Sequence, residues 1–452
     1  MRNIVGSPFV IKGVLYLDSY KKRKGIQTMK LNYKRTFFIG FAFLAISAFW
    51  YLYDNIVPLI LQNTFHLSES LIGVIMAIDN VLAVFLLPII GGFSDKVDTP
   101  LGKRTPFIIG GTAAAVILMM MMPMADSKGN IILFVVALGA TLLAMAMYRS
   151  PAVALMPDLT PKPLRSKANA VINLMGTIGG MYTLVLIRTL VGEGKTPSYL
   201  AVFIGVAGIM VLSVIMLLCT TNENKIAAQV ALEYPEQEEQ ETVQKDGKQD
   251  KLAPEVKKSL ILILLSVFFW FAAYNAVTTA FSRYAVTVWG MENGGYANCL
   301  MIATVAALIS YIPIGMIASK IGRKKTILIG IVLMGSCFLM ASFMPKYHPI
   351  INVGFCIIGF SWAAIGVNSL PMVVEMSKSG DVGKYTGLYY TFSMSAQIAT
   401  PILSGMLLDF ISYRTLFPYA VVFSVLAFVT MSMVKHGDNR PEAKKDMLEN
   451  FE

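Results

Sequence analysis

Charged residues are scarce in this chain: Lys, Arg, Asp and Glu supply 14% of its 452 residues, whereas hydrophobic residues supply 56%. Soluble globular domains carry roughly 25% charged residues, so this composition excludes an ordinary soluble enzyme or binding domain. The mean hydropathy of +0.63 indicates a membrane protein. At about 20 residues or slightly more per span, the length accommodates about twelve spans joined by short loops.

Cysteine and histidine are also rare. The four cysteines show no CxxC spacing, and the three histidines fall in expected loops or the tail. A disulfide scaffold, a metal site and a histidine-based catalytic site are therefore not expected. The chain lacks the GxxxxGK(S/T) loop that holds nucleotide phosphates, so ATP is not expected to drive it directly. We expect no cofactor and no enzymatic activity.

Twelve apolar runs are each long enough to cross a bilayer. Six lie in the first half of the sequence, at 37–61, 71–93, 105–124, 133–156, 168–191 and 198–218. Six more lie at 260–288, 298–318, 326–344, 350–374, 385–408 and 415–434. The sequence thus predicts an all-α membrane protein with two six-helix bundles, at 36–221 and 259–434. An N-terminal extension (1–35), a polar linker (222–258) and a tail (435–452) complete the expected organisation.

The net charge of +11 would suit a nucleic-acid binder, but the placement of the basic residues indicates membrane topology instead. The loops on one side hold only Lys128, Lys195, Lys346 and Arg414. Three arginines lie within the runs, and all other basic residues fall on the side of the extension, the linker and the tail. By the positive-inside rule this side is cytoplasmic. We expect a monomer in the cell membrane with both termini cytoplasmic, a bilayer as its partner and no nucleic acid.

We expect no cleavable signal before the first apolar run. The short apolar pieces of 1–35 lack a continuous apolar region followed by a cleavage site. The first span is therefore expected to direct insertion. Met29, followed by Lys-Leu-Asn-Tyr-Lys-Arg, is an alternative start to Met1.

The two halves of the sequence repeat one another. A loop motif stands between the second and third runs, and a degenerate copy stands between the eighth and ninth. The motif residues are Gly91, Asp95, Lys96, Gly102, Lys103 and Arg104 in the first copy and Gly315, Gly322 and Arg323 in the second. Acids also close the fourth and tenth runs, at Asp158 and Glu375. Matching features in the same order predict two related bundles, an organisation typical of transporters.

The pattern GxxxD(K/R)…G(K/R)(K/R) resembles the loop motif of the major facilitator superfamily, and the resemblance covers almost the whole chain. The longer stretches GGFSDKVDTPLGKRTPFI and SPAVALMPDL are similar to the sucrose:proton symporters and the glycoside-pentoside-hexuronide:cation symporters. This resemblance implies alternating-access transport of a sugar or glycoside with protons or another monovalent cation. Val153 stands where the sucrose symporters have an arginine, and Leu142 where they have an acid. The resemblance therefore does not identify sucrose itself as the substrate.

A charge within the bilayer costs about 2.5–3.5 kcal/mol, so an ionisable residue inside a span requires an explanation. Three such residues could couple transport to an ion. Asp79 lies roughly 15 Å along its helix from Glu69, near the middle of the hydrocarbon core. Arg149, roughly 13 Å from Asp158, is too deep to snorkel easily and could hold a substrate hydroxyl or keep Asp79 ionised. Asp54, nearer the outer surface, is the next candidate. A structural ion pair is the alternative for each.

Sugars bind where aromatic faces and amide side chains meet in a cleft between bundles. The spans offer nine such residues. They are Trp50, Tyr53, Asn55, Asn173, Tyr274, Asn275, Trp362, Asn368 and Gln397. For each of them alone, helix packing is the alternative role.

Asp95 is the expected acid of a cytoplasmic gate, both by its charge and by resemblance. Basic residues of the same loop lie near it in sequence, and Arg165 lies on the neighbouring loop. The counterpart of Asp95 in the second half, Ser319, lacks a carboxylate. We therefore expect an asymmetric gate.

The sequence as a whole predicts a secondary active transporter for a small polar solute. Proton-coupled symport of a mono- or disaccharide or a glycoside is the preferred hypothesis, because Asp79 and Arg149 with polar aromatic residues favour hydrophilic cargo. An exporter or antiporter for another small organic solute is the alternative.

Overall fold

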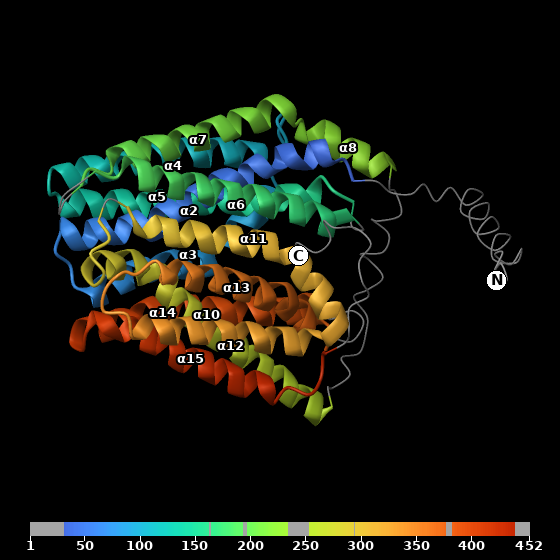
Figure 1. Ribbon diagram of the computed structural model, residues 1–452. Coiled ribbons are helices and arrows are strands. Elements are labelled where there is room, and N and C mark those ends of the chain that lie inside the picture. Colours follow the sequence, from blue (N-terminus) through green and yellow to red (C-terminus); the bar gives the residue numbers. More distant parts are fainter. Residues whose placement is uncertain are drawn as a thin grey trace, which may run out of the picture.

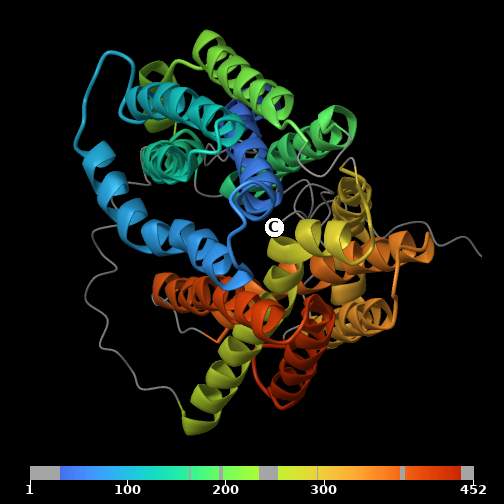
Figure 2. The same cartoon turned by 90° about the vertical axis from the view of Figure 1, so that its left-hand side faces the viewer.

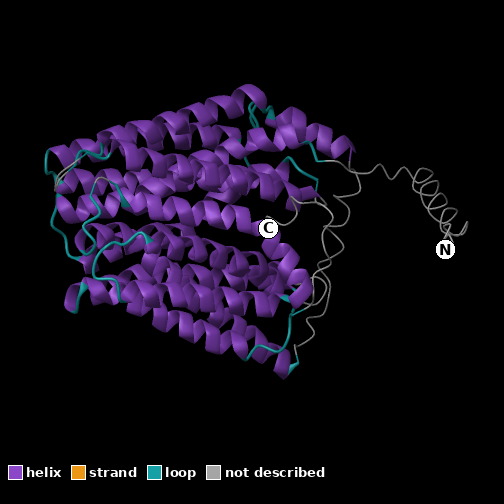
Figure 3. Cartoon of the chain, viewed as in Figure 1, coloured by secondary structure: helices purple, strands orange, loops and turns teal. Residues whose placement is uncertain are grey.

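The computed structural model describes residues 31–161, 164–192, 197–233, 253–292, 294–376 and 382–438. Within these ranges the secondary structure is helical, with no strand (Figure 3). Both candidate start methionines, most of the linker and the end of the tail lie outside the described residues.

Six long helices make up each half of the described chain (Figure 1). The first half comprises α2 (Tyr33–Asn63), α3 (Glu69–Asp95), α4 (Thr105–Ser127), α5 (Ile131–Asp158), α6 (Arg165–Leu190) and α7 (Leu200–Thr220). The short helix α8 (Glu223–Glu233) follows at the start of the linker. The second half comprises α10 (Pro254–Thr287), α11 (Tyr296–Ile321), α12 (Arg323–Ser342), α13 (Ile350–Val374), α14 (Val382–Phe410) and α15 (Leu416–Ser432), with the turn η3 (Tyr413–Thr415) before α15.

Eleven of the described helices are long and apolar enough to cross a membrane. The chain is therefore an all-α, multi-pass membrane protein, as the sequence predicts. The other long helix is α14, whose 29 residues include Ser393, Ser395 and Gln397 within the apolar stretch. Of these three residues, Gln397 lines cavities between the two halves, as described below. The twelfth span at α14 stays a prediction.

Polar caps extend the helices beyond the apolar runs. The side chain of Asn32 accepts a hydrogen bond from the Arg35 backbone N–H at 3.0 Å, and Asn130 accepts one from Leu133 at 3.0 Å. Such caps satisfy backbone donors that a helix leaves unpaired in its first turn. With these caps, α2 begins at Tyr33 and α5 at Ile131, slightly before the apolar runs.

The two halves pack by the same rule. In the first half α2 lies along α6 and α7, and α4 lies along α5 and α7. In the second half the corresponding helix α10 lies along α14 and α15, and α12 lies along α13 and α15. The halves meet where α3 contacts α14, α6 contacts α11 and α2 contacts α10 (Figure 2). This equivalence agrees with the sequence repeat.

The bundle is wider at one end than at the other. We call the end with α8 and the start of α2 the terminal side, and the other end the opposite side. Towards the terminal side α7 and α15 diverge in Figure 1. The hydrogen bonds and the ion pair described between the halves, in contrast, gather towards the opposite side.

Candidate transport site

A polar cavity of 160 Å³ lies between the two halves. Its lining residues are Trp50 and Asp54 of α2, Met76, Asp79 and Asn80 of α3, Arg149 of α5, Asn275, Thr278 and Thr279 of α10, and Gln397 and Pro401 of α14. The three ionisable residues singled out in the sequence therefore line one cavity. Five helices from both halves build it, so any relative movement of the halves changes its shape.

The charged groups of this polar cavity are held differently. Asp79 accepts a hydrogen bond from the side-chain amide of Asn80 at 2.9 Å. The guanidinium carbon of Arg149 lies 5.5 Å from the centre of the Trp50 ring, within the range of a cation–π interaction. Arg149 forms no salt bridge within 4.0 Å to any residue in the described part of the chain. Its N–H donors can therefore receive a ligand or a carboxylate that moves.

A second cavity of 280 Å³ adjoins the first. Its lining residues are Tyr51, Asp54 and Asn55 of α2, Phe271, Tyr274, Asn275 and Thr278 of α10, Leu300, Ala303 and Thr304 of α11, Trp362 of α13, and Gln397 of α14. Four residues border both cavities, and Asp54 is the ionisable one among them. We call this second cavity the aromatic cavity; the shared residues make it a direct neighbour of the polar cavity between the halves.

Stacked rings form one wall of the aromatic cavity. The rings of Tyr274 and Trp362 lie 3.8 Å apart at 13°, and Phe271 meets Trp362 edge-on at 5.4 Å. Phe271, Tyr274, Asn275 and Thr278 follow helical spacing, so α10 presents them on one face. This spacing was the signal that could have identified Phe271 and Thr278 from the sequence.

Asn173 lies in a third cavity of 390 Å³, lined by residues of α2, α6, α11 and α13. Tyr51 borders both this cavity and the aromatic cavity. Asn173 is therefore placed beside the two central cavities but not in them. The sequence analysis missed Tyr51, which connects the two spaces.

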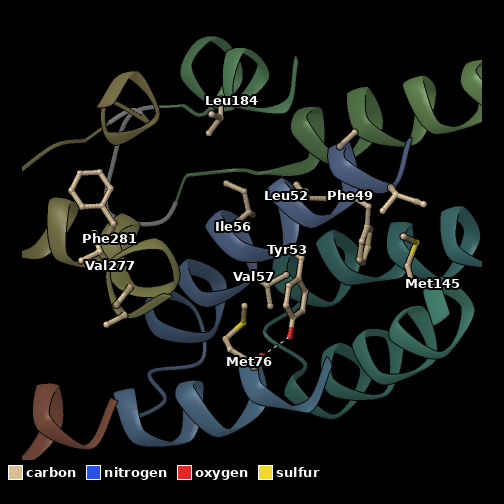
Figure 4. Close-up of a cluster of buried hydrophobic side chains, with 14 of the residues drawn as sticks. Phe49, Leu52, Tyr53, Ile56, Val57, Met76, Met145, Leu184, Val277 and Phe281 are labelled. Carbon is tan, nitrogen blue, oxygen red and sulfur yellow. Dashed lines mark hydrogen bonds between the residues drawn. The ribbon is translucent and has the colours of Figure 1, made fainter. Parts of the chain in front are cut away.

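Tyr53 and Asn368 are placed in helix packing and line none of these three cavities. Tyr53 is 1% exposed, and its hydroxyl donates to the Met76 carbonyl oxygen at 3.4 Å in the core of the first half (Figure 4). Asn368 is 1% exposed and donates from its amide to the Ala364 carbonyl oxygen at 2.9 Å. The other seven aromatic and amide candidates border one of the cavities.

The loop motif of the first half gathers around Arg104 on the terminal side. Its guanidinium donates to Asp158 at 2.8 Å and also to Asp95 and Ser94. Burial lowers the pKa of Arg104, but its bonds to Asp158 and Asp95 outweigh burial and raise that pKa above its ordinary value. Arg104 therefore stays charged and ties the ends of α3 and α5 to the start of α4.

The second half repeats this arrangement with fewer groups. Arg323, at the start of α12, pairs with Glu375 at the end of α13. Ser319 instead bonds the Met316 carbonyl oxygen of its own helix at 2.8 Å. Gly102 and Gly322 both adopt positive φ, at 114° and 96°, which a side chain would strain. The backbone of the motif therefore requires glycine at these two positions.

An acid that follows the last helix of each half caps the third helix of the same half. Glu223 of α8 accepts hydrogen bonds from the backbone N–H groups of Lys103 at 2.8 Å and Thr105 at 2.9 Å. Asp438 accepts one from Lys324 at 2.8 Å. Carboxylates at helix N-termini are stabilising. The sequence analysis missed both acids, although each stands just beyond its half's last apolar run.

Asp95→Asn is expected to slow transport severalfold while the affinity for substrate changes little. The variant weakens the Arg104 cluster, which holds three helix ends, without touching the cavities. Initial rates measured across a range of substrate concentrations test this. The neighbouring exposed Asp98→Asn is the control and should behave as wild type; equal effects of both variants would contradict the role of Asp95.

The chain matches a family model described as MFS/sugar transport protein over residues 38–434. Because this match covers most of the sequence, the chain belongs to that family of major facilitator transporters. No curated protein matches it. The resemblance to the superfamily read from the loop motif is thus confirmed.

Solved transporters share the fold. The nucleoside transporter NupG is 14% identical with a TM-score of 0.66, and the alignment covers 89% of this chain and 100% of NupG. The E. coli xylose transporter XylE, in an inward-open conformation, is 15% identical with a TM-score of 0.62, and the alignment covers 93% of this chain and 98% of XylE. At such identities the likeness concerns the fold alone.

Proposed function

We propose that the protein transports a sugar or glycoside together with protons by alternating access. The observation that carries this proposal is the pair of neighbouring central cavities, which combines two carboxyl groups and an arginine with a stacked aromatic wall. The sugar-transport description of the family supports the same substrate class.

The aromatic cavity suits a sugar ring. The faces of Tyr274 and Trp362 offer a rigid apolar surface to the C–H groups of a ring. Asn55, Asn275 and Gln397 surround this surface with amides that can donate to and accept from hydroxyls. The combined volume of the two central cavities accommodates a small saccharide and excludes a large polymer.

The polar cavity suits proton coupling. Asp54 and Asp79 carry two carboxylates there, and Arg149 is the cation that can stabilise one of them at a time. When the halves rock, residues of α2, α3 and α5 change their distances to residues of the second half. A carboxylate whose surroundings alternate in this way can bind a proton in one state and release it in the other.

Addition of the transported sugar to energy-depleted cells should raise the external pH, because protons enter with it. A glycoside panel applied to cells expressing the protein and to cells without it tests the proposal. A protonophore, as control, should abolish the signal. Substrate uptake without any pH change in a weakly buffered suspension would contradict proton symport.

We propose that the terminal side is cytoplasmic, because most basic residues outside the spans lie on that side. A cysteine at the exposed Lys128, on the opposite side, should react with a membrane-impermeant reagent added to intact cells. The matched variant Lys225→Cys on α8 should react only after the cells are opened. The reverse labelling pattern would invert the topology.

A further inference from the structure

Equivalent positions of α2 and α10 line the aromatic cavity from the two halves. The residues at these positions are Tyr51, Asp54 and Asn55 in α2 and Phe271, Tyr274 and Asn275 in α10. The interval from each residue to its counterpart is the same. The acid of α2 corresponds to a tyrosine of α10, whereas asparagine stands in both halves. Asn55 and Asn275 are thus a repeat-related pair that borders one cavity.

Both asparagines orient their amides in the same way. Asn55 donates from Nδ2 to the Tyr51 carbonyl oxygen at 2.9 Å, and Asn275 donates from Nδ2 to the Phe271 carbonyl oxygen at 2.8 Å. A side-chain oxygen cannot take the place of the nitrogen here, because a backbone carbonyl is itself an acceptor. The nitrogen of each amide is therefore anchored on its own helix, and the oxygen remains available as an acceptor.

Other polar side chains of the aromatic cavity also donate to their own helices. Gln397 donates from Nε2 to the Ser393 carbonyl oxygen at 3.4 Å. The hydroxyl of Thr304 donates its hydrogen to the Leu300 carbonyl oxygen at 2.8 Å. Because a hydroxyl has a single hydrogen, Thr304 offers only lone pairs to a ligand.

The remaining lining residues add few donors. No lysine, arginine or histidine is among the described residues that line the aromatic cavity, and Asp54 is its ionisable residue. The hydroxyls of Tyr51 and Tyr274 and the second N–H of each amide are the donors that remain. The wall of this cavity is therefore richer in acceptors than in donors.

The oxygen of Asn55 lacks a hydrogen-bond partner. Asn55 is 4% exposed, and its Oδ1 accepts no hydrogen bond from any residue that the structure describes. Buried polar atoms are nearly always hydrogen-bonded, because an unpaired one loses its bonds to water without replacement. A donor bound in the aromatic cavity would supply the missing bond.

We infer that Asn55 and Asn275, together with Gln397, determine substrate specificity by accepting hydrogen bonds from the substrate. This acceptor clamp rests on the proposed function and refines the substrate class: sugars whose clamped positions carry a free hydroxyl or amino group. Sugars that are fluorinated or O-methylated at these positions lack the required donor. Each half contributes one asparagine, so a clamped sugar is held by both halves.

Sugar analogues test the clamp in the unmodified protein. The probes are the methyl glycosides of glucose, galactose, mannose and xylose, with fluorine or an ammonium group replacing each hydroxyl in turn. Fluorine cannot donate a hydrogen bond, whereas an ammonium group donates but cannot accept. We expect fluorine at a clamped position to weaken equilibrium binding to the purified protein roughly tenfold, and an ammonium group there to preserve or strengthen it. The opposite pattern would show that the amides donate, and it would overturn the clamp.

Alanine variants assign the penalty to particular residues. Asn55→Ala and Asn275→Ala should each remove the fluorine penalty at one position of the sugar, so that the hydroxyl and fluorine forms bind equally there. Asn368→Ala is the matched control, because Asn368 makes the same bond within its helix, to the Ala364 carbonyl oxygen at 2.9 Å, but lines none of the three cavities. It should retain the wild-type penalties. Unchanged penalties in both cavity variants would overturn the clamp.

Failure of the clamp is distinguishable from failure of the proposed function. If a probe sugar binds and its fluorinated forms bind equally well at every position, the clamp is wrong while sugar remains the substrate class. If none of the probe sugars binds, the proposed sugar transport is contradicted and the clamp with it. The comparison of analogues in the unmodified protein is decisive even if the alanine variants do not fold.

Discussion

Asp79→Asn should abolish uphill, pH-driven accumulation of substrate and reduce the internal-to-external ratio to about one, while exchange of substrate across the membrane continues. An amide at this position imitates the protonated carboxyl group permanently. Exchange needs no net release of protons, so a carrier fixed in this form can still rock with substrate bound. Net accumulation, in contrast, requires that the proton leave on the inner side.

Accumulation and exchange measured side by side in proteoliposomes test this prediction. Asp126→Asn is the control, because Asp126 lies near the opposite-side end of α4, bonded to Thr64 at 2.6 Å and outside the central cavities. Asp54→Asn belongs in the same series, since Asp54 borders both central cavities. An Asp79→Asn protein with normal pH-driven accumulation would make Asp79 structural and Asp54 the next candidate for coupling.

Arg149→Lys should lower the apparent affinity for substrate by roughly tenfold to a hundredfold, as expected from the loss of one hydrogen bond to a charged donor, which contributes about 1.5–3 kcal/mol. Lysine keeps the positive charge beside Asp79 but loses the planar donors of the guanidinium that lies over the Trp50 ring. Coupling should therefore survive at saturating substrate. Arg149→Gln should lose both affinity and coupling.

Substrate titrations of uptake in the presence and absence of a pH gradient separate these effects. Arg188→Lys is the control, because Arg188 also lies in a helix of the first half but lines none of the three cavities. If Arg149→Lys keeps its affinity for substrate but loses coupling, Arg149 interacts with the carboxylates alone and does not contact the substrate.

The depth of a residue along its span could be predicted from the sequence, but the direction of its side chain could not. Helical rise placed Asp79 and Arg149 deep in their spans, and both line the polar cavity. Tyr53 and Asp54 are neighbours in sequence, yet Tyr53 points into the core and Asp54 into the cavities. Successive helical residues differ by about 100° in direction, so a small uncertainty in the rotation of a helix exchanges these two roles.

Contacts between the halves could not be predicted from the sequence, for a different reason. The apolar runs and the repeated motif define each bundle, and they single out Arg104 and Asp158, whose pairing is shown by the structure. Glu69 and Arg283 are distant in sequence and meet only because the bundles close on the opposite side. An arginine near the end of a span can snorkel or pair with an acid, and for Arg283 the identity of that acid depends on how the two halves are arranged. Glu223 and Asp438 were missed because each caps a helix far from it in sequence.

The most direct test of the account is sugar accumulation by the purified protein in sealed proteoliposomes, with an imposed pH gradient as the sole driving force. A panel of mono- and disaccharides and glycosides should include at least one compound that accumulates above its external concentration. That accumulation should collapse when the gradient is dissipated, and internal acidification should accompany it. If the protein equilibrates such a compound but never concentrates it under any pH gradient, proton-coupled sugar transport is contradicted.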